Sequence, residues 1–180
     1  MKVAVILATG FEEIEAISII DILRRGDIEC LSVGLDRRKV EGAHNIVVYT
    51  DIVLDDLNVD EFDMIILPGG LPGADNLANS KKLIDILHSF DANNKRIGAI
   101  CASPFVLAKA DLIKNSYTCY PGFEKKVDKN GYMPNQNVVR DHNIMTSRGP
   151  ATAMEFALEI LRELKGEKTY NEIKEGLLFV

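Results

Sequence analysis

The sequence predicts an α/β fold in which helices cover both faces of a mostly parallel β-sheet. Short apolar runs rich in β-branched residues alternate with stretches of helical periodicity along the 180 residues. The first run, residues 3–7, is apolar throughout, as expected for a strand that is covered on both faces. Alternation of strands and helices requires parallel crossovers, which favours this architecture over an all-α or all-β one.

The expected elements follow one another in a regular order. After the strand at residues 3–7, residues 13–25 predict a well-buried helix that ends at Gly26. Residues 39–43 and 46–50 predict a small antiparallel hairpin. Further strands are expected over residues 29–34, 64–67, 96–100, 138–140 and 144–147. Helices are expected over residues 80–90, with Ser80 as N-cap, 102–110 and 151–164. The whole order is that of a flavodoxin-like three-layer sandwich.

Composition and charge limit the classes of function. Lysine and arginine number 21 against 27 aspartates and glutamates, and the net charge of −6 argues against a nucleic-acid-binding surface. No apolar run approaches the roughly 18 residues of a membrane span. No linker divides the chain, so we expect one domain over residues 1–180. The three cysteines form no disulfide or zinc motif and imply reducing, cytoplasmic surroundings. The apolar residues 176–180 are expected to dock on the protein or on a partner.

The most informative stretch is RIGAICASPFVLA at residues 96–108. Cys101 falls where the predicted strand turns into a helix, and small residues surround it. Small neighbours permit the sharp turn of a nucleophile elbow. The free N–H groups of the following helix favour a thiolate, which is the nucleophilic form. We therefore interpret Cys101 as a reactive thiol, the alternative being a buried core cysteine.

Two other predicted strand ends carry residues suited to the same site. Gly69 and Gly70 follow the strand at residues 64–67 and are candidate backbone donors to an oxyanion. Glu15 lies about one turn into the first helix, on an apolar face where its protonated form is favoured. A protonated Glu15 can donate a hydrogen bond to a thiolate or move a proton. The alternative is that the acids of this helical turn only complement the helix dipole.

Several motifs are missing from the sequence. It has no GxGxxG after the first strand, no GxxxxGK[ST] and no HExxH. His44, His88 and His142 are scattered, with no cysteine or carboxylate at metal-ligand spacing. We therefore predict no metal, no dinucleotide and no other cofactor.

The order and spacing of four blocks resemble those of the ThiJ/PfpI superfamily, and most of all its DJ-one (parkinsonism-associated deglycase) branch and the bacterial members of that branch. The blocks are VAVILATGFEEIE, DMIILPGGLPGADNL, AICASP and TSRGPATAMEFALEIL. The resemblance implies that Cys101 is the nucleophilic and redox-sensing cysteine and that Glu15 is a protonated glutamate bonded to it. It further implies amide donors at Gly69, Gly70 and Ala102, and a homodimer with the first helix and the hairpin at its interface.

The chain departs from this superfamily at several positions. Ala102 stands where protease-like members have histidine, which makes a peptidase or amidase-like hydrolase the least supported function. Tyr120 stands where the deglycase branch commonly has a histidine, and a tyrosine is a poor base near neutral pH. Cys119 is either a resolving thiol or a packed strand cysteine. His44 aligns roughly with an arginine that approaches the site from the other subunit, although a role in the hairpin turn is favoured.

Together these features predict a cofactor-independent cysteine enzyme of glyoxalase III or deglycase type. Its substrates would be α-oxoaldehydes or glycation adducts, and it would have no nucleic-acid or membrane partner. The alternative is a non-catalytic redox sensor or redox-regulated chaperone, in which Cys101 is oxidised under oxidative stress.

Overall fold

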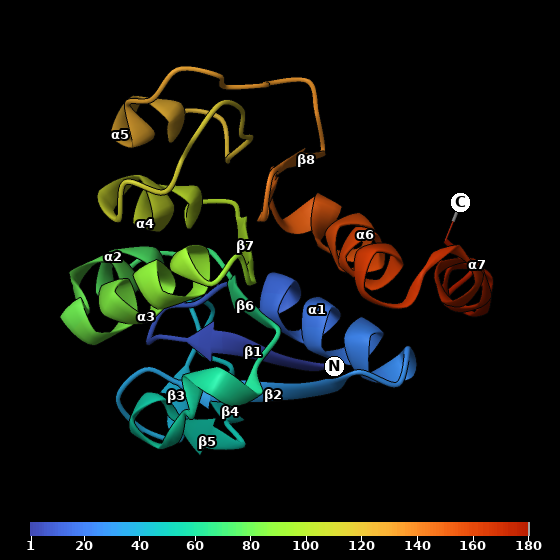
Figure 1. Cartoon of the computed structure of the whole chain (residues 1–180). Coiled ribbons are helices and arrows are strands. Elements are labelled where there is room, and N and C mark those ends of the chain that lie inside the picture. Colours follow the sequence, from blue (N-terminus) through green and yellow to red (C-terminus); the bar gives the residue numbers. More distant parts are fainter. Residues whose placement is uncertain (180) are drawn as a thin grey trace.

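Within residues 1–179, the part of the chain that the computed structural model describes, seven strands form one sheet in the order β5-β2-β1-β6-β7-β9-β8 (Figure 1). Only β8 runs antiparallel to its neighbour, β9, and the other strand pairs are parallel. The mostly parallel sheet that the sequence predicts is therefore confirmed. The strands span Lys2–Leu7 (β1), Glu29–Gly34 (β2), Ile52–Val53 (β5), Met64–Leu67 (β6), Arg96–Ile100 (β7), Val138–Asp141 (β8) and Ile144–Ser147 (β9).

A separate hairpin pairs β3 (Lys39–Glu41) with β4 (Val47–Tyr49) in antiparallel fashion, as predicted. Its strands are shorter than expected because residues 42–46 form the turn. The N–H of Gly42 donates to the carbonyl of Ile46 at 2.9 Å, and Asn45 has a φ of 64°.

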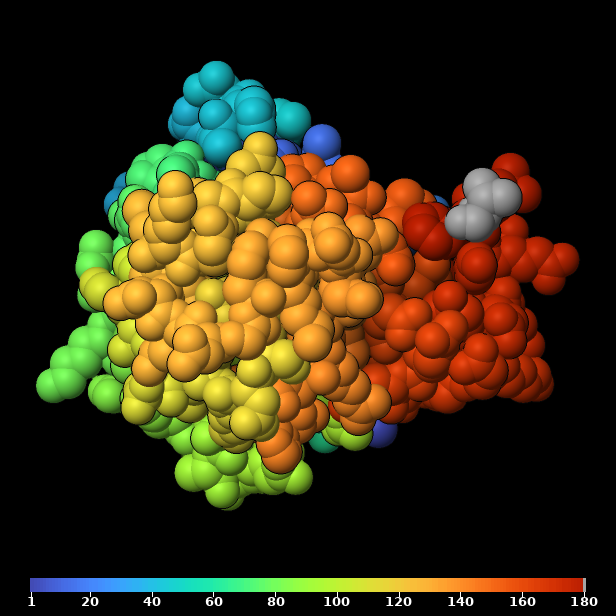
Figure 2. All heavy atoms as spheres, turned by 90° about the horizontal axis from the view of Figure 1, so that it is seen from above, coloured from blue at the N-terminus to red at the C-terminus, as the bar shows by residue number. Residues whose placement is uncertain are grey.

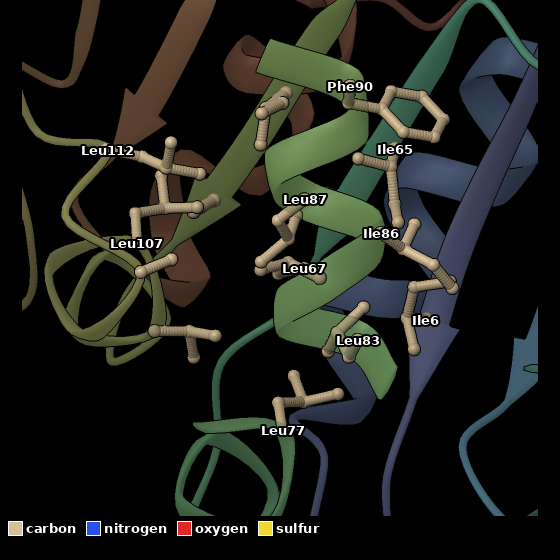
Figure 3. Packing of buried hydrophobic residues seen from close by; sticks show 14 of the residues in the cluster. Ile6, Ile65, Leu67, Leu77, Leu83, Ile86, Leu87, Phe90, Leu107 and Leu112 are labelled. Carbon is tan, nitrogen blue, oxygen red and sulfur yellow. The ribbon is translucent and has the colours of Figure 1, made fainter. Parts of the chain in front are cut away.

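Helices cover both faces of the sheet because its inner strands are apolar on both sides. Ile6, Ile65 and Leu67 point to one face, where they pack against α2, α3, α4 and α5; Figure 3 shows this packing around α3. Val5 and Ile66 point to the other face and pack against α1 and α6, and α7 packs on α6. The helices span Glu13–Arg25 (α1), Gly73–Asn79 (α2), Lys81–Ala92 (α3), Pro104–Lys109 (α4), Glu124–Val127 (α5), Ala153–Lys165 (α6) and Glu167–Gly176 (α7).

Most expected helices are present, with changes at their ends. Ser80 caps α3 as predicted, since its hydroxyl accepts a hydrogen bond from the N–H of Leu83 at 3.3 Å. The helix after β7 begins at Pro104 rather than at residue 102, because residues 101–103 form a separate turn. The sequence prediction lacks β5, α2, α5 and α7. The apolar side chains of α7 are few and only partly buried, although Tyr170 and Ile173 pack against the cluster with α6.

The first helix is less buried than expected. Ile14 and Ile17 are 59% and 45% exposed, whereas Glu13 and Glu15 are buried. The expectation of a well-buried helix is therefore wrong for the face that carries the two isoleucines. That face of α1 leaves aliphatic side chains on the surface.

The end of the chain is partly docked, as expected. Leu177 and Phe179 pack against the cluster formed with α1 and α6, while Leu178 is exposed and Val180 lies outside the described residues. No helix of the described residues has the length and apolar character needed to cross a bilayer. Seen from above, the segment between α4 and β9 covers much of the molecule, with the β3–β4 hairpin at the top edge and α7 at the right (Figure 2).

Candidate active site

The segments that follow three neighbouring parallel strands meet at one edge of the sheet. Since β1, β6 and β7 are adjacent, their carboxyl ends lie together. The N–H of Glu12, after β1, donates to the carbonyl of Gly69, after β6, at 2.9 Å. The buried hydroxyl of Ser103, after β7, donates to the carbonyl of Pro68 at 2.6 Å. These bonds join the three sequence blocks into one site.

Cys101 lies in the turn between β7 and α4 with a φ of 65°, a left-handed conformation that is uncommon for residues other than glycine. Its N–H donates to the carbonyl of Ser147 at 2.9 Å, and its carbonyl accepts from the N–H of Tyr120 at 2.8 Å. Bonds on both sides hold a backbone conformation that is unfavourable by itself. The geometry is that of a nucleophile elbow, with a side chain that remains 9% exposed.

Glu15 faces Cys101 from α1 and is 0% exposed. Its Oε2 accepts a hydrogen bond from the N–H of Gly69 at 2.7 Å, and its carboxyl lies within hydrogen-bonding reach of the Cys101 thiol. Its Oε1 is buried and has no hydrogen bond of ordinary geometry to any of residues 1–179. Burial raises the pKa of Glu15 from 4.5 to about 7, so a proton on this carboxyl persists to near-neutral pH.

Only glycine fits at the two positions after Pro68. A Cβ on Gly69 would lie 2.7 Å from the Cβ of Cys101 and 2.9 Å from Oε2 of Glu15. Gly70 has a φ of 88°, and a Cβ there would lie 2.4 Å from the backbone nitrogen of Glu12. The expectation that both glycines donate to an oxyanion is corrected for Gly69, because its N–H is already bound to Glu15.

The backbone N–H groups of Gly70 and Ala102 lie near the sulfur of Cys101 and act to lower the pKa of its thiol. Burial, and next the negative charge of an ionised Glu15, act in the opposite direction and raise that pKa above the ordinary value. The expected thiolate is therefore not favoured while Glu15 is ionised. Nor does a long helix begin beside the sulfur, since α4 has only 6 residues and starts at Pro104.

The two acids form a coupled pair whose protons leave in two steps that belong to both groups. When Glu15 holds a proton, its negative charge no longer opposes the thiolate, and its O–H is a donor to sulfur. The pair with one proton is thus the state in which a Cys101 thiolate is least costly.

The segment that follows α4 brings Cys119 and Tyr120 close to Cys101, but the two residues have different surroundings. Cys119 is fully buried in the cluster with α2–α5, whereas Cys101 belongs to the cluster with α1 and α6. Burial raises the pKa of Cys119 to about 12. The packed-cysteine interpretation of Cys119 fits this environment better than a resolving thiol. Tyr120 meets Cys101 through its backbone N–H, and its side chain is exposed.

His44 lies in the hairpin turn, where Glu13 holds it. Both its backbone N–H and its Nδ1 bond to the carboxyl of Glu13, at 2.7 and 2.9 Å. The side chains of Glu12, Glu13 and His44 lie close enough together to share a metal ion. The sequence did not indicate this arrangement. Because Glu13 also accepts from the N–H of Ile46 at 3.4 Å, its oxygens are engaged in fixing the hairpin.

Sequence reasoning missed two side chains near this site. Glu13, read as an acid near the helix dipole, holds the hairpin against α1. Arg148 lines a hollow beside Tyr120. The block TSRGPATAMEFALEIL contains Arg148, and an arginine directly after a predicted strand was a signal for a charged group at the functional edge of the sheet.

Comparisons with known proteins match the chain along almost its whole length. The model of the DJ-1/PfpI family matches residues 1–163. DJ-1beta of Drosophila melanogaster is 40% identical over 177 residues, which cover 97% of this chain and 95% of that protein. The glutathione-independent glyoxalase DJR-1.2 of Caenorhabditis elegans is 38% identical over 167 residues, or 92% of this chain and 89% of that protein.

Solved structures agree. The crystal structure of Drosophila DJ-1beta has a TM-score of 0.96 at 39% identity and covers 100% of both chains. Toxoplasma gondii DJ-1, in an oxidized form, has a TM-score of 0.92 at 35% identity over 99% of this chain and 98% of that one. The bacterial origin suggested by the sequence blocks stays a prediction. The protein belongs to the DJ-1/PfpI family, in its DJ-1 branch.

Proposed function

We propose that the protein is a cofactor-independent, cysteine-dependent enzyme that converts α-oxoaldehydes to hydroxy acids, or removes the same adducts from glycated groups. The observation that carries this proposal is the pairing of Cys101, in its strained turn, with a fully buried Glu15 whose pKa lies near 7. A relative of 38% identity that is named a glyoxalase supports it.

The first step is addition of the Cys101 thiolate to the aldehyde carbon. A carbon–sulfur bond forms, and the carbonyl π electrons move to oxygen, which takes the proton held by Glu15. The product is a hemithioacetal and an ionised Glu15. The N–H groups of Gly70 and Ala102 face the sulfur and are placed to stabilise negative charge on the adduct.

Glu15 then acts as the base. It removes the proton from the former aldehyde carbon; the C–H electron pair forms a carbon–carbon double bond, and the π electrons of the neighbouring ketone move onto its oxygen to give an enediolate. Glu15 returns the proton to the neighbouring carbon while the hydroxyl proton of the first carbon passes to the enediolate oxygen, which yields a thioester of a hydroxy acid. Water cleaves the thioester, which releases the hydroxy acid and regenerates the thiol, so the net change is addition of one water. A carboxyl with a pKa near 7 suits both the acid and the base steps.

We also propose that the working form is a homodimer joined through α1 and the hairpin. Exposed aliphatic and aromatic side chains gather on these two elements, and Glu13 of α1 bonds to the hairpin turn. Exposed apolar side chains on two elements that are bonded together are typical of an interface. Its residues are Ile14, Ile17, Ile46, Val47 and Tyr49.

Turnover of methylglyoxal to lactate tests the reaction. Wild type should form lactate, while Cys101→Ser and Glu15→Ala should each lose activity on the order of a hundredfold or more. The variant Cys30→Ser is the matched control, because Cys30 is buried in β2. Equal rates in wild type and both site variants would contradict the enzymatic proposal.

A redox sensor is the second candidate, supported by the oxidized form of the Toxoplasma gondii relative. Oxidation of Cys101 by peroxide would place sulfinate oxygens beside the Gly70 and Ala102 amides and the free Oε1 of Glu15. Intact mass after peroxide titration should then show two added oxygens on wild type and none on Cys101→Ser. No stable addition on wild type at modest peroxide would remove this candidate.

A further inference from the structure

A hollow of about 600 Å³ opens beside the nucleophile, lined by Tyr120, Pro121, Asn137 and residues 148–152. Two of its walls are tied to Cys101. The N–H of Tyr120 donates to the carbonyl of Cys101, and the carbonyl of Ser147, which directly precedes Arg148, accepts from the N–H of Cys101. The hollow is therefore part of the same rigid unit as the reactive sulfur.

The size of the hollow exceeds what a three-carbon substrate needs. Ligand pockets of roughly 300–1,000 Å³ hold molecules of drug size, and this one lies within that range. Cys101 is not itself among the lining residues, so a three-carbon substrate bound at its sulfur would leave the hollow free. The space suits a substrate with a longer chain attached to its carbonyl carbons.

Arg148 gives this space its charge. The residue is half-buried, and its backbone N–H donates to the carbonyl of Asn137 at 3.0 Å, which fixes the start of its side chain. Within residues 1–179 no carboxylate forms an ion pair with its guanidinium. Five other arginines are ion-paired, namely Arg24, Arg25, Arg96, Arg140 and Arg162, whereas Arg37 and Arg38, like Arg148, form no ion pair with these residues.

The unpaired guanidinium of Arg148 contrasts with the acidic segment that supplies Glu15. Glu12, Glu13 and Glu15 all belong to the neighbouring segment, and the chain as a whole carries a net charge of −6. Arg148 lines the hollow, and the planar donor fork of its guanidinium matches the paired oxygens of a carboxylate or a phosphate.

We propose that Arg148 recognises an anionic group on the substrate, and that the preferred substrates are α-oxoaldehydes or adducts that carry a carboxylate or phosphate a few bonds from the reacting carbons. The inference rests on the proposed function, because it takes Cys101 as the atom that forms the adduct. It assigns Arg148 to specificity and leaves the bond-making steps to Cys101 and Glu15.

Competition between matched substrates tests the assignment. The ratio of kcat/KM for 4,5-dioxopentanoate to that for its uncharged methyl ester measures the preference for a carboxylate, and an α-oxoaldehyde phosphate ester gives the phosphate arm. Arg148→Gln should lower at least one of these ratios by about ten- to a hundredfold, the value of a hydrogen bond to a charged group. Arg148→Lys should retain part of the preference. Arg140→Gln is the control, because Arg140 pairs with Glu163 away from this hollow.

A binding measurement separates failure of this inference from failure of the reaction. Iodoacetamide alkylation of Cys101 is followed with 4-oxopentanoate, a phosphonate of the same length, or 4-oxopentanamide present. Protection by either anion that exceeds protection by the amide in wild type, and that Arg148→Gln removes, supports the pocket even if no variant turns over methylglyoxal. Equal protection by all three compounds, or anion protection that Arg148→Gln leaves intact, would overturn it.

Discussion

Cys101 and Cys119 are both buried, both free and close in the fold, yet only Cys101 has polar groups gathered around its sulfur. Burial raises the pKa of both thiols. For Cys119, burial is the largest cause of the raised pKa, and the charge of Glu124 is the other cause. Around Cys101, two backbone N–H groups and the carboxyl of Glu15 surround the sulfur, and the backbone is held at positive φ.

The comparison shows that burial by itself makes a cysteine inert, and that directional groups decide whether it can react. The sulfur of Cys101 gives up contact with water but gains donors that prefer the anion. Cys119 loses water and gains apolar packing from the α2–α5 side of the sheet. The predictions below change one of the two environments at a time.

The largest difference is expected in thiol labelling of the native protein. Iodoacetamide should alkylate Cys101, while Cys119 and Cys30 react only after unfolding, because they are 0% and 2% exposed and lack donors to sulfur. Peptide mass spectrometry of native and urea-unfolded samples measures this directly. We expect a rate ratio on the order of a hundredfold or more. Comparable native labelling of Cys119 would erase the contrast between the two cysteines.

The next largest effect is expected in the free energy of unfolding, which an ionised, buried Glu15 lowers. The unfolded carboxyl ionises near 4.5 and the folded one near 7, so the folded state loses stability as the pH rises through this window. Glu15→Gln removes the ionisation and should raise the free energy of unfolding by about 2–3 kcal/mol at and above neutral pH, with little change below the unfolded value. Urea unfolding at several pH values measures it.

Glu12→Gln is the control for Glu15→Gln, because it changes a neighbouring acid outside the Cys101 pair. The same Glu15→Gln protein should lose turnover by about 10²–10⁴-fold, since glutamine cannot transfer a proton. A variant that is more stable and less active would show that this carboxyl is kept for function. A variant destabilised equally at all pH values would show that Glu15 is ionised and structurally required.

A matched pair of glycines probes the loops on the two sides. Gly70, beside Cys101, and Gly122, after Cys119, both have positive φ, but only Gly70 lacks space for a Cβ. Gly122→Ala should lower the free energy of unfolding by about 1 kcal/mol, the backbone cost alone. Gly70→Ala should lower it by about 3 kcal/mol, since the clash with the Glu12 backbone adds to that cost. If the Gly70 loop could relax to relieve the clash, urea unfolding would show the same loss of free energy for both variants, and that result would contradict the prediction.

The smallest effect is expected at Tyr120. Its backbone N–H, and not its phenol, bonds to Cys101. Tyr120→Phe should therefore change kcat/KM for methylglyoxal by no more than about threefold. A loss of tenfold or more would show that the Tyr120 hydroxyl takes part in proton transfer, which the proposed mechanism assigns to the Glu15 carboxyl alone.

The sequence was a good guide to the sheet and to the residues around Cys101, for physical reasons. Fully apolar runs such as residues 3–7 are hard to place anywhere except in a covered parallel strand. The small residues at Gly98, Ala99 and Ala102 indicated the elbow. Because parallel strands end together, the sequence also brought Glu15, Gly69 and Cys101 to one edge.

Other features depend on three-dimensional contacts that no local pattern reveals. The N–H of Gly69 is taken by Glu15, which required the position of a side chain 54 residues away in the chain. The burial of Glu13 followed from its bonds to the hairpin turn. The exposed Ile14 has the same appearance in sequence as a core residue. The mostly polar helix α7 packs on α6 through few apolar side chains that are only partly buried, so its apolar stripe is thin.

The pH dependence of Cys101 alkylation tests the central claim that Cys101 and Glu15 share one proton. Rates of iodoacetamide labelling, read from intact mass, should give wild type an apparent pKa near 7 or lower, well below the roughly 8.5 of a free thiol. Glu15→Ala should move this value to about 8.5 or higher, because burial then acts on the thiol without a carboxyl to hold the proton. An apparent pKa near 8.5 in wild type, or one that Glu15→Ala leaves unchanged, would contradict the shared proton.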